Sequence, residues 1–465
     1  MLPVLTPEEM AAVDHQAPEP VETLIGRAGA AVAHRAGRLL DGPYRRRVVV
    51  VVGRGNNGAD GRAASRILEA QGARVQVREA AELAPGGNLG PADLVIDAAY
   101  GTGLQRAYMP PCPRGPVLAV DIPSGLLGLT GQLPEGGGAM PAVATVTFAA
   151  WKPGLLLGRG PELAGSVELA GIGLEPLAAA AARCWLVQDA DVDRLLPGRP
   201  RDAHKWQSAV QVVAGSPGMT GAPWLVSRAA MRAGAGYVRL SMPGVDPAVM
   251  PPGELVHLPV PRAGWHQQVL EQVGRVKALV VGPGLGPVTH QGSLPGGEVG
   301  ELVAGAGVPT VVDADGLNAI GTFDALATLT ARRRHPTVVT PHDGEFSRLA
   351  GSPPGPDRVG AARAAAQRSG AIVLLKGSTT VVAGPDGRAL VSAAGDARLA
   401  TAGTGDVLSG VIGAFVARGI PAFEAAALGA HVHGRAASLG HRQGLVAGDI
   451  PDLVACWLSG RAAGQ

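Results

Sequence analysis

Short apolar segments that end in glycine-rich or polar loops recur along this chain of 465 residues. The first covers residues 47–53 and contains five consecutive valines, and a helical pattern begins a few residues later. Strands without an alternating polar face are buried on both sides, as in a parallel sheet covered by helices. An opening helix is expected over about residues 21–40. Four further segments of the same kind follow, at 73–79, 93–103, 116–125 and 144–154.

The pattern lapses near residue 180 and then begins again. A chain of this length is too long for one ordinary hydrophobic core. We therefore expect two α/β domains, residues 1–180 with a Rossmann-like three-layer fold and residues 181–465 with a second α/β fold. A helix is expected over about 222–235. The apolar segments of the second half lie at 208–223, 278–286, 309–318, 336–346, 371–387 and 400–415.

The composition excludes several classes of partner. The formal net charge is +2, and 4 Tyr, 5 Phe and 6 Trp offer little surface for base stacking, so neither nucleic acid nor an anionic membrane is an expected partner. No apolar run is long enough to span a bilayer, and the first residues do not resemble a signal peptide. The three scattered cysteines fit a reducing compartment. We expect a cytoplasmic protein that forms a homo-oligomer.

The glycine turn after the first strand, "GRGNNGADG", has the GxGxxG spacing at Gly53, Gly55 and Gly58. This spacing is typical of dinucleotide-binding turns, and a dehydrogenase would place an acid such as Glu79 about 20 residues further on. The same spacing also occurs in simple tight turns. Asparagines and Asp60 crowd this turn, where a cofactor pyrophosphate would be bound by backbone amides. The dinucleotide could therefore be a cofactor or a substrate.

Oxygen-bearing side chains follow three separate strands of the first half. Asn57, Asp97 and Ser124 offer only oxygen ligands, which suit a hard cation rather than zinc. Asp121 ends a buried strand, where it could transfer a proton or merely cap the following turn. Lys152 could neutralise a phosphate, or it could be a surface lysine that extends into solvent.

The three motifs "GRGNNGADG", "DLVIDAAYGTGL" and "VLAVDIPSGL" together resemble the NAD(P)H-hydrate epimerases, over about residues 20–175. The resemblance implies a potassium ion held by Asn57, Asp97 and Ser124. Two departures from the family pattern are Ala59, where a glycine is usual, and Gly26, where a glutamate is usual. The implied contacts to the hydrated dinucleotide are Asn56, Asn57, Gly58, Ala59, Asp60, Gly101, Thr102, Gly103, Leu104, Gln105, Arg106, Ala107 and Asp121.

The segment "TAGTGDVLSG" is the most specific motif of the second half. Gly403 and Gly405 allow a sharp turn, after which a helix would begin with its free amides exposed to the oxyanions of a phosphoryl group. Asp406 could deprotonate an attacking hydroxyl, or it could be the N-cap of the helix. Lys376 follows another strand in "LLKGSTTVV". Further acids follow other strands, Asp313 in "DADGLN" and Glu345 in "TPHDGEF".

The GTGD motif and the strand followed by Lys–Gly resemble the ribokinase-like superfamily. Over about residues 185–460 the chain is similar to the ADP-dependent NAD(P)H-hydrate dehydratases, through "GSPGMTGAP", "VVGPGLG", "TPHDGEF", "KGSTTV" and "AGTGDVLSG". Magnesium is expected with the nucleotide. The resemblance implies substrate contacts from Ala222, Gly284, His342 and Asp406, and nucleotide contacts from Lys376, Gly377, Ser378, Thr379, Thr380 and Gly405.

These features predict a bifunctional enzyme whose substrate is a damaged dinucleotide. The first domain would interconvert the R and S hydrates of NADH and NADPH, with Asp121 moving the proton. The second would remove water from the S hydrate at the expense of ADP, with Asp406 as base. A kinase of a small alcohol such as a vitamin precursor, fused to a nucleotide-binding domain, is the alternative, and a nucleotide sensor without activity is a third reading.

The segment "HVHG" (431–434) is not expected to bind zinc, because two histidines two apart on a helix do not share a face.

Overall fold

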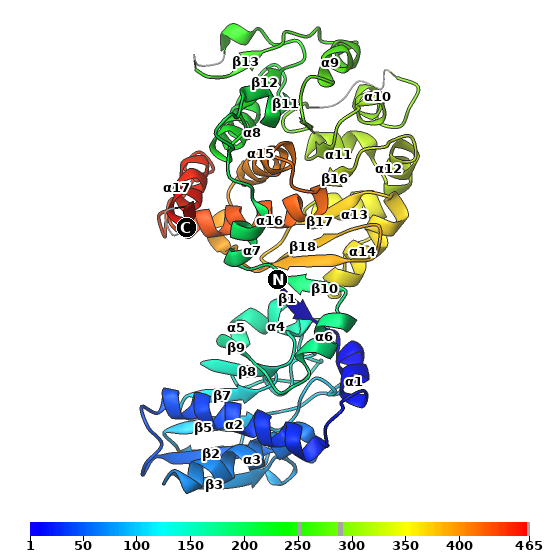
Figure 1. Ribbon diagram of the computed structural model, residues 1–465. Helices are drawn as coiled ribbons and strands as arrows, with labels where there is room; N and C mark the ends of the chain where they lie inside the picture. The colour runs from blue at the N-terminus through cyan, green and yellow to red at the C-terminus, as the bar shows by residue number, and fades with distance from the viewer. Residues whose placement is uncertain (250–252, 287–291, 463–465) are drawn as a thin grey trace. The chain divides into compact units, whose positions relative to one another are not determined.

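The computed structural model describes residues 1–249, 253–286 and 292–462. The chain divides into two compact units at Trp185 and Leu186, a few residues beyond the boundary expected near residue 180. Each unit is an α/β structure with its own sheet (Figure 1). The described residues include no helix that is both long and apolar enough to cross a membrane.

The sheet of the first unit has the order β3-β2-β5-β7-β8-β9, and all of its neighbouring strands are parallel. The observed α2 begins at Val21 and ends at Leu39, which confirms the expected opening helix. The elements of this unit are β1 (Leu2–Val4), α1 (Pro7–His15), α2 (Val21–Leu39), β2 (Arg47–Val52), α3 (Asn56–Ala70), β3 (Arg74–Glu79), η1 (Ala80–Glu82), β4 (Asn88–Pro91), β5 (Leu94–Ala98), β6 (Cys112–Arg114), β7 (Val117–Val120), β8 (Ala144–Phe148), α4 (Pro153–Leu156), α5 (Gly160–Leu163), β9 (Ser166–Ala170) and α6 (Glu175–Ala181).

The valines of β2 explain why this sheet is buried on both faces. Val48, Val50 and Val52 pack into a core that also contains residues of α2 and α3. Val49 and Val51 point the other way, into a second core. Because successive side chains of a strand alternate between faces, five valines in a row require cover on both sides. The two helices α2 and α3 lie side by side over one of these faces (Figure 1).

The second unit has a sheet that is mostly parallel, with the order β19-β18-β17-β16-β15-β14-β11-β12-β13. Only β18 runs antiparallel to its two neighbours. Its elements follow β10 (Cys184–Leu186) and are α7 (Asp189–Leu195), η2 (Lys205–Ser208), β11 (Ala209–Val213), α8 (Gly221–Arg232), β12 (Tyr237–Ser241), η3 (Pro247–Val249), β13 (Val256–His257), α9 (Trp265–Val273), β14 (Ala278–Val281), α10 (Gly297–Gly305), β15 (Thr310–Val312), α11 (Asp315–Ile320), α12 (Phe323–Thr330), β16 (Thr337–Val339), α13 (Asp343–Ala350), α14 (Arg358–Ser369), β17 (Ile372–Leu375), β18 (Thr380–Ala383), β19 (Ala389–Ser392), η4 (Ala397–Leu399), α15 (Thr404–Ala417), α16 (Ala422–Ala437) and α17 (Ile450–Ala462).

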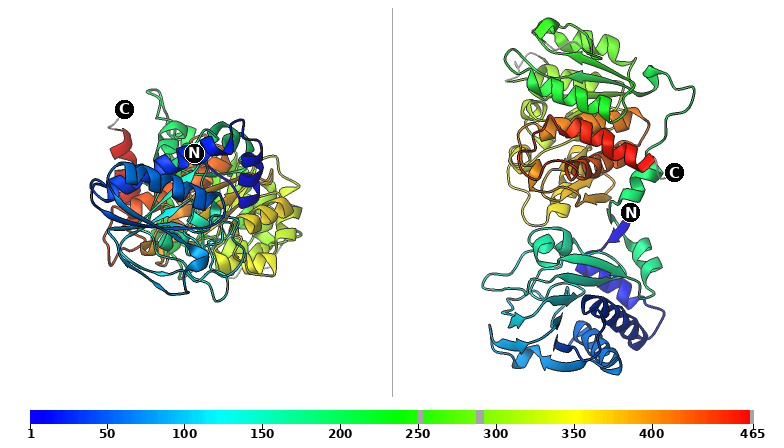
Figure 2. Two further views of the ribbon diagram at one scale, coloured as in Figure 1. Left: turned by 90° about the horizontal axis from the view of Figure 1, so that it is seen from below. Right: turned by 90° about the vertical axis from the view of Figure 1, so that its left-hand side faces the viewer.

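Helix α15 is the central helix of the second unit. Every residue from Val407 to Ala417 is buried, as expected for a helix that is apolar on all sides. It packs against α8, α16 and the strands β11 and β14, whereas α17 lies on the outside against α16 and α8 (Figure 2). The N-terminus of α15 is thereby fixed beside the loops that follow the parallel strands, where ligands bind in open α/β sheets.

Candidate active sites

A cavity of about 790 Å³ lies at the carboxyl ends of the strands of the first unit. Many residues implied by the epimerase resemblance line it, whereas Gly58, Ala59, Gln105 and Ala107 are not among the lining residues. Ala59 has a helical backbone within α3, so the glycine that is usual there is not required by a positive φ. The predicted residues that line the cavity are Asn56, Asn57, Asp60, Gly101, Thr102, Gly103, Leu104, Arg106 and Asp121.

Asp121 and Lys152 form a buried ion pair in this cavity. The Lys152 ammonium lies 2.5 Å from Asp121 Oδ1 and also donates to the Thr147 hydroxyl and the Phe148 carbonyl oxygen. Lys152 is only 1% exposed, so the reading of it as a surface lysine is wrong. Asp121 has a φ of +66°, a strained conformation for a residue with a side chain and one that is common at functional sites.

Two further acids face the same cavity. Burial and the nearby carboxylate of Asp121 raise the pKa of Asp60 to about 8. Burial likewise raises the pKa of Asp14, which α1 contributes and which the sequence analysis did not single out. The cavity therefore contains an Asp60 that keeps its proton at neutral pH and an Asp121 that lies in an ion pair with Lys152. Opposed environments of this kind separate acids from bases in active sites.

The three predicted cation ligands lie at adjoining loops. The Ser124 hydroxyl donates to Asp97 Oδ1 at 2.6 Å, and the Ser124 amide donates to Oδ2 at 2.9 Å. The Tyr100 amide donates to the Ser124 hydroxyl, and the next residue, Gly101, lies against Asn57. Both polar atoms of the Asn57 side chain are buried and have no hydrogen-bond partner among the described residues. Burial raises the pKa of Asp97, and no positively charged group among the described residues pairs with it.

The glycine turn after β2 is closely packed. A Cβ at Gly58 would lie 1.9 Å from the Gly53 carbonyl oxygen, so the turn is packed against its own backbone. Glu79, the acid that a dehydrogenase would use for a ribose hydroxyl, forms an ion pair with Arg62. Arg62 also donates to the Gly53 carbonyl oxygen, so this pair fixes the turn.

In the second unit, Asp313 and Lys376 pair at the ends of β15 and β17. Lys376 Nζ donates to Asp313 Oδ1 at 2.9 Å, and the Ser409 hydroxyl donates to Oδ2 at 2.7 Å. Burial opposes the ionisation of Asp313, but Lys376 and Ser409 outweigh it and hold its pKa below the ordinary value. Glu345 is a third member of the cluster, 3.5 Å from Lys376 Nζ.

The predicted GTGD turn lies beside this cluster. Gly403 is the N-cap of α15 with a φ of +91°, and no side chain caps the helix, so the interpretation of Asp406 as the N-cap is wrong. The first-turn amides are thus without partners inside the helix. A Cβ at Gly405 would lie 3.4 Å from Lys376 Nζ. Burial and the nearby Asp313 raise the pKa of Asp406 to about 7.

The remaining predicted contacts occupy neighbouring loops. Ala222, near the start of α8, lies against Gly284, where a Cβ would be 3.0 Å from the Ala222 Cβ. His342 is the N-cap of α13, and its Nδ1 accepts from the amides of Gly344 and Glu345. Its other ring nitrogen lies 3.6 Å from the Glu345 carboxylate.

The predicted nucleotide segment, residues 376–380, is the turn between the antiparallel strands β17 and β18. Arg358 donates to the Lys376 carbonyl oxygen at 2.8 Å and pairs with Asp343 at the start of α13. This arginine ties the turn to the neighbouring loop. The sequence analysis did not single it out.

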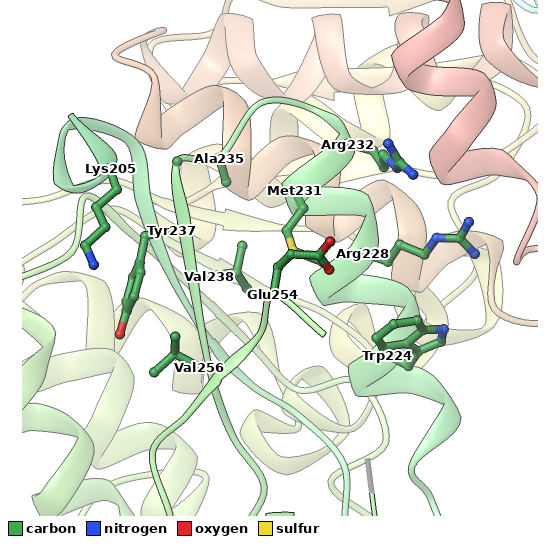
Figure 3. A pocket seen from close by; sticks show the side chains of 11 residues that line it. Lys205, Trp224, Arg228, Met231, Arg232, Ala235, Tyr237, Val238, Glu254 and Val256 are labelled. Atoms are coloured by element: carbon green, nitrogen blue, oxygen red, sulfur yellow. The ribbon is translucent and has the colours of Figure 1, made fainter. Parts of the chain in front are cut away.

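A separate cavity of about 530 Å³ runs along α8 and β12 (Figure 3). Arg228, Arg232 and Trp224 project from α8, with Lys205 and Tyr237 across from them. It is lined by residues near the start of β12 rather than its carboxyl end, and it contains none of the predicted site residues.

The two halves of the chain match two families of known proteins. Residues 210–458 match the model of a family described as NAD(P)H-hydrate dehydratase, and residues 21–87 and 78–154 match one described as YjeF-related protein N-terminus. The bifunctional NAD(P)H-hydrate repair enzyme Nnr of Salinibacter ruber is 36% identical over 529 aligned positions, which cover 97% of this chain and 95% of that protein. This chain belongs to the bifunctional NAD(P)H-hydrate repair enzyme family.

Other members of this repair enzyme family match nearly as much of the chain. The Nnr enzyme of Mycobacterium tuberculosis is 39% identical to this chain. The alignment covers 88% of this chain and 87% of that enzyme. Among solved structures, the chain is similar to an ADP/ATP-dependent NAD(P)H-hydrate dehydratase from Bacillus subtilis. The matched region covers 59% of this chain and 98% of the Bacillus subtilis chain. Its sequence identity is 26% and its TM-score is 0.49.

Proposed function

We propose that this chain repairs hydrated NADH and NADPH through two activities, one in each unit. The first unit interconverts the R and S hydrates, and the second dehydrates the S hydrate with ADP, giving NAD(P)H, AMP and phosphate. The observation that carries this proposal is that the residues implied for each activity gather at the strand ends of its own unit. The family match over both units supports the same assignment.

In the first unit, Asp121 is the proton carrier. Inverting the hydroxyl on the carbon beside the ring nitrogen requires loss and return of water, so a proton must be moved each way. Lys152 donates to the Asp121 carboxylate at 2.5 Å and holds it in place within the site. The cavity of about 790 Å³ suits a dinucleotide fragment better than a small alcohol.

A potassium ion fits the set formed by Asn57, Asp97 and Ser124. The unpartnered Asn57 amide and the buried Asp97 carboxylate without a cationic partner are both groups that a bound cation would satisfy. Their oxygen-only chemistry matches a hard cation. Bound there, the ion would fix the loop after β5 and polarise a substrate oxygen.

In the second unit, Asp406 accepts the proton of the substrate hydroxyl as that oxygen takes a phosphoryl group from ADP and AMP leaves. The first-turn amides of α15 and the Lys376 ammonium stabilise the charge on the phosphoryl oxygens. The lone pair of the ring nitrogen then expels phosphate, and the adjacent carbon loses a proton to restore the ring double bond.

Magnesium fits the second site because carboxylates outnumber cations there. Asp313, Asp315 and Glu345 all raise the pKa of Asp406, after burial as the largest cause, and only Lys376 opposes them among the named charges. Mg²⁺ is usually bound by one or two carboxylates together with the substrate phosphates. It would neutralise the nucleotide phosphates in this acidic site. The three cysteines, Cys112, Cys184 and Cys456, form no disulfide within the described part of the chain, which fits our assignment to the cytoplasm.

The test is to incubate the chain with purified R or S hydrate of NADH, with and without ADP. We expect nucleotide-independent interconversion of R and S, and ADP-dependent recovery of the absorbance of reduced nicotinamide. A stable phosphorylated product would instead support the small-molecule kinase, and no turnover would support a sensor. A parallel incubation with ATP determines which nucleotide is used.

A further inference from the structure

A cavity of about 350 Å³ lies at the C-terminal end of α15. Arg418, the C-cap of this helix, lines it together with residues of the segment 197–208 and Gly236. Gly403 caps the other end of the helix, so about 21 Å of helix separates the cavity from the GTGD turn. None of the predicted site residues lines this cavity, so the proposed chemistry does not account for it.

Two arginines approach each other at this cavity. Arg199 Nη2 donates to the Gly234 carbonyl oxygen at 2.9 Å, and Arg418 Nη1 donates to the Ala233 carbonyl oxygen at 3.2 Å. The guanidinium groups therefore meet at consecutive carbonyls at the end of α8. Neither arginine forms an ion pair with a carboxylate in the described part of the chain. Burial and the nearby Arg199 lower the pKa of Arg418. An anion between the two groups would relieve their repulsion.

Lys205 is the third cation that lines this cavity. Its ammonium lies 5.4 Å from the ring centroid of Tyr237 and 5.8 Å from that of Trp206, and it has no carboxylate partner among the described residues. An aromatic ring attracts an ammonium without neutralising it. No aspartate or glutamate of the described residues lines the cavity. It therefore presents three positive charges that no neighbouring acid compensates.

The cavity of about 530 Å³ along α8 and β12 adjoins this one, because Lys205 and Gly236 line both. Figure 3 shows Lys205 and Tyr237 on one side of this larger cavity and Trp224 on the other. Its two arginines, Arg228 and Arg232, both pair with Asp452, so their charges are already compensated. The larger cavity thus offers ring surface, and the smaller one offers uncompensated positive charge.

We propose that these two adjoining cavities form a second nucleotide site, in which the cations of the smaller cavity hold the phosphate groups and the larger cavity holds the base. Arginine suits the phosphate because its planar donors match the phosphate oxygens, and such charge-assisted hydrogen bonds are strong. Trp224 and Tyr237 offer the base the aromatic contact on which bases stack. The site goes beyond the proposed function, since it lies at the end of α15 opposite to the turn assigned to phosphoryl transfer.

The probe is 8-azido-ADP, added to the full-length chain, photolysed and located by mass spectrometry of the labelled peptides. We expect label in two regions, around residues 376–406 and within residues 224–238. The label in 224–238 should be lost in the double variant Arg199→Gln/Lys205→Gln, because each charged hydrogen bond removed weakens binding roughly 10–100-fold. Both side chains are exposed, so the fold should be unaffected. Arg334→Gln, which replaces another exposed arginine of this unit, is the matched control and should keep both labels.

Trp224→Ala distinguishes a nucleotide site from a site for phosphate alone. The concentration of 8-azido-ADP that gives half-maximal labelling of residues 224–238 should rise roughly tenfold, because the base loses a ring contact. An unchanged concentration would mean that the cations bind phosphate alone and would overturn the nucleotide assignment. Label confined to residues 376–406, label in 224–238 that the double variant retains, or equal loss in Arg334→Gln would overturn the site itself. None of these readouts requires turnover, so failure of this proposal and failure of the proposed function are distinguishable.

Discussion

The Lys152 ammonium lies 2.5 Å from the Asp121 carboxylate, and the lysine is buried while the aspartate faces the cavity. A buried ammonium is costly unless it is paired and its protons are bonded, and here three oxygens accept from it. The lysine therefore fixes the position of the carboxylate assigned to proton transfer. Lysine is also rare in this chain, with four in total.

We predict that Lys152→Met slows epimerisation by roughly 10²–10⁴, the usual contribution of a proton-transfer group, because Asp121 loses the ammonium that holds its carboxylate in position. The rate is measured as interconversion of purified R and S hydrates without nucleotide. Lys277→Met, which replaces an exposed lysine, should leave it unchanged. Parent-like epimerisation in Lys152→Met would show that the ion pair serves only packing.

Asp60 gives the first unit a specific pH dependence of stability. Its folded pKa of about 8 lies above the ordinary value of 3.8, so the folded chain keeps a proton that the unfolded chain releases. The contribution of Asp60 to the free energy of unfolding thus falls as pH rises from about 4 to about 8, by at most roughly 1.4 kcal/mol per pH unit. Above pH 8 it is constant.

Asp60→Asn should remove this dependence, because asparagine does not titrate. We predict that the variant is more stable than the parent at pH 8 and similar to it at pH 4, in urea unfolding followed by circular dichroism. Glu69→Gln, which removes an exposed acid of the same unit, serves as the control. An equal stability difference at both pH values would mean that Asp60 is ionised in the folded chain.

The cation assignment predicts an effect on stability as well as on rate. A potassium ion that binds only the folded chain should raise the melting temperature of the first unit with increasing K⁺, and sodium should do so less. Asp97→Ala should abolish this dependence and slow epimerisation, while dehydration of pure S hydrate stays near the parent rate. Loss of both activities together would indicate general unfolding instead.

The sequence predicted the parts of this molecule that depend on local pattern. Residues 48–52 predicted a strand buried on both faces, and the GTGD motif placed Asp406 at the start of a helix. Asn57 was expected in the loop before the next helix, but α3 already begins at Asn56. The ion pair of Asp313 with Lys376 joins residues far apart in sequence, through strand order that local pattern does not reveal. The two alternatives for Lys152 could not be separated for the same reason, since its partner Asp121 follows another strand.

The boundary between the units also could not be placed from local sequence pattern alone. Ala178 and Ala182 of the segment around α6 pack into the core of the first unit, so this helix belongs there although its alanine-rich sequence reads as a linker. We predict that fragments 1–182 and 183–465 fold separately, the first epimerising without nucleotide and the second dehydrating only the S hydrate. Circular dichroism and the two assays check this. Inactive fragments from an active full-length chain would contradict it.

Asp406 carries the prediction that most directly tests the second activity. Burial and the nearby Asp313 raise its pKa to about 7, so the dehydration rate should rise with pH through about 7 as the carboxylate forms. Asp406→Asn preserves size but cannot accept the proton, and it should lower kcat by roughly 10²–10⁴ and remove this rise.

Because the N-cap of α15 is Gly403, the Asp406→Asn substitution leaves helix capping intact and the melting temperature should not fall. ADP binding, measured by calorimetry, should change little, and epimerisation should be unaffected. Asp324→Asn is the matched control, since Asp324 is an exposed acid whose partner is Arg368 on the surface.

If the Asp406→Asn variant turns over within a few-fold of the parent rate, the catalytic base must be sought among the other acids of the cluster. Glu345 is then the next candidate, because Asp313 is already held ionised by Lys376 and bonded to Ser409.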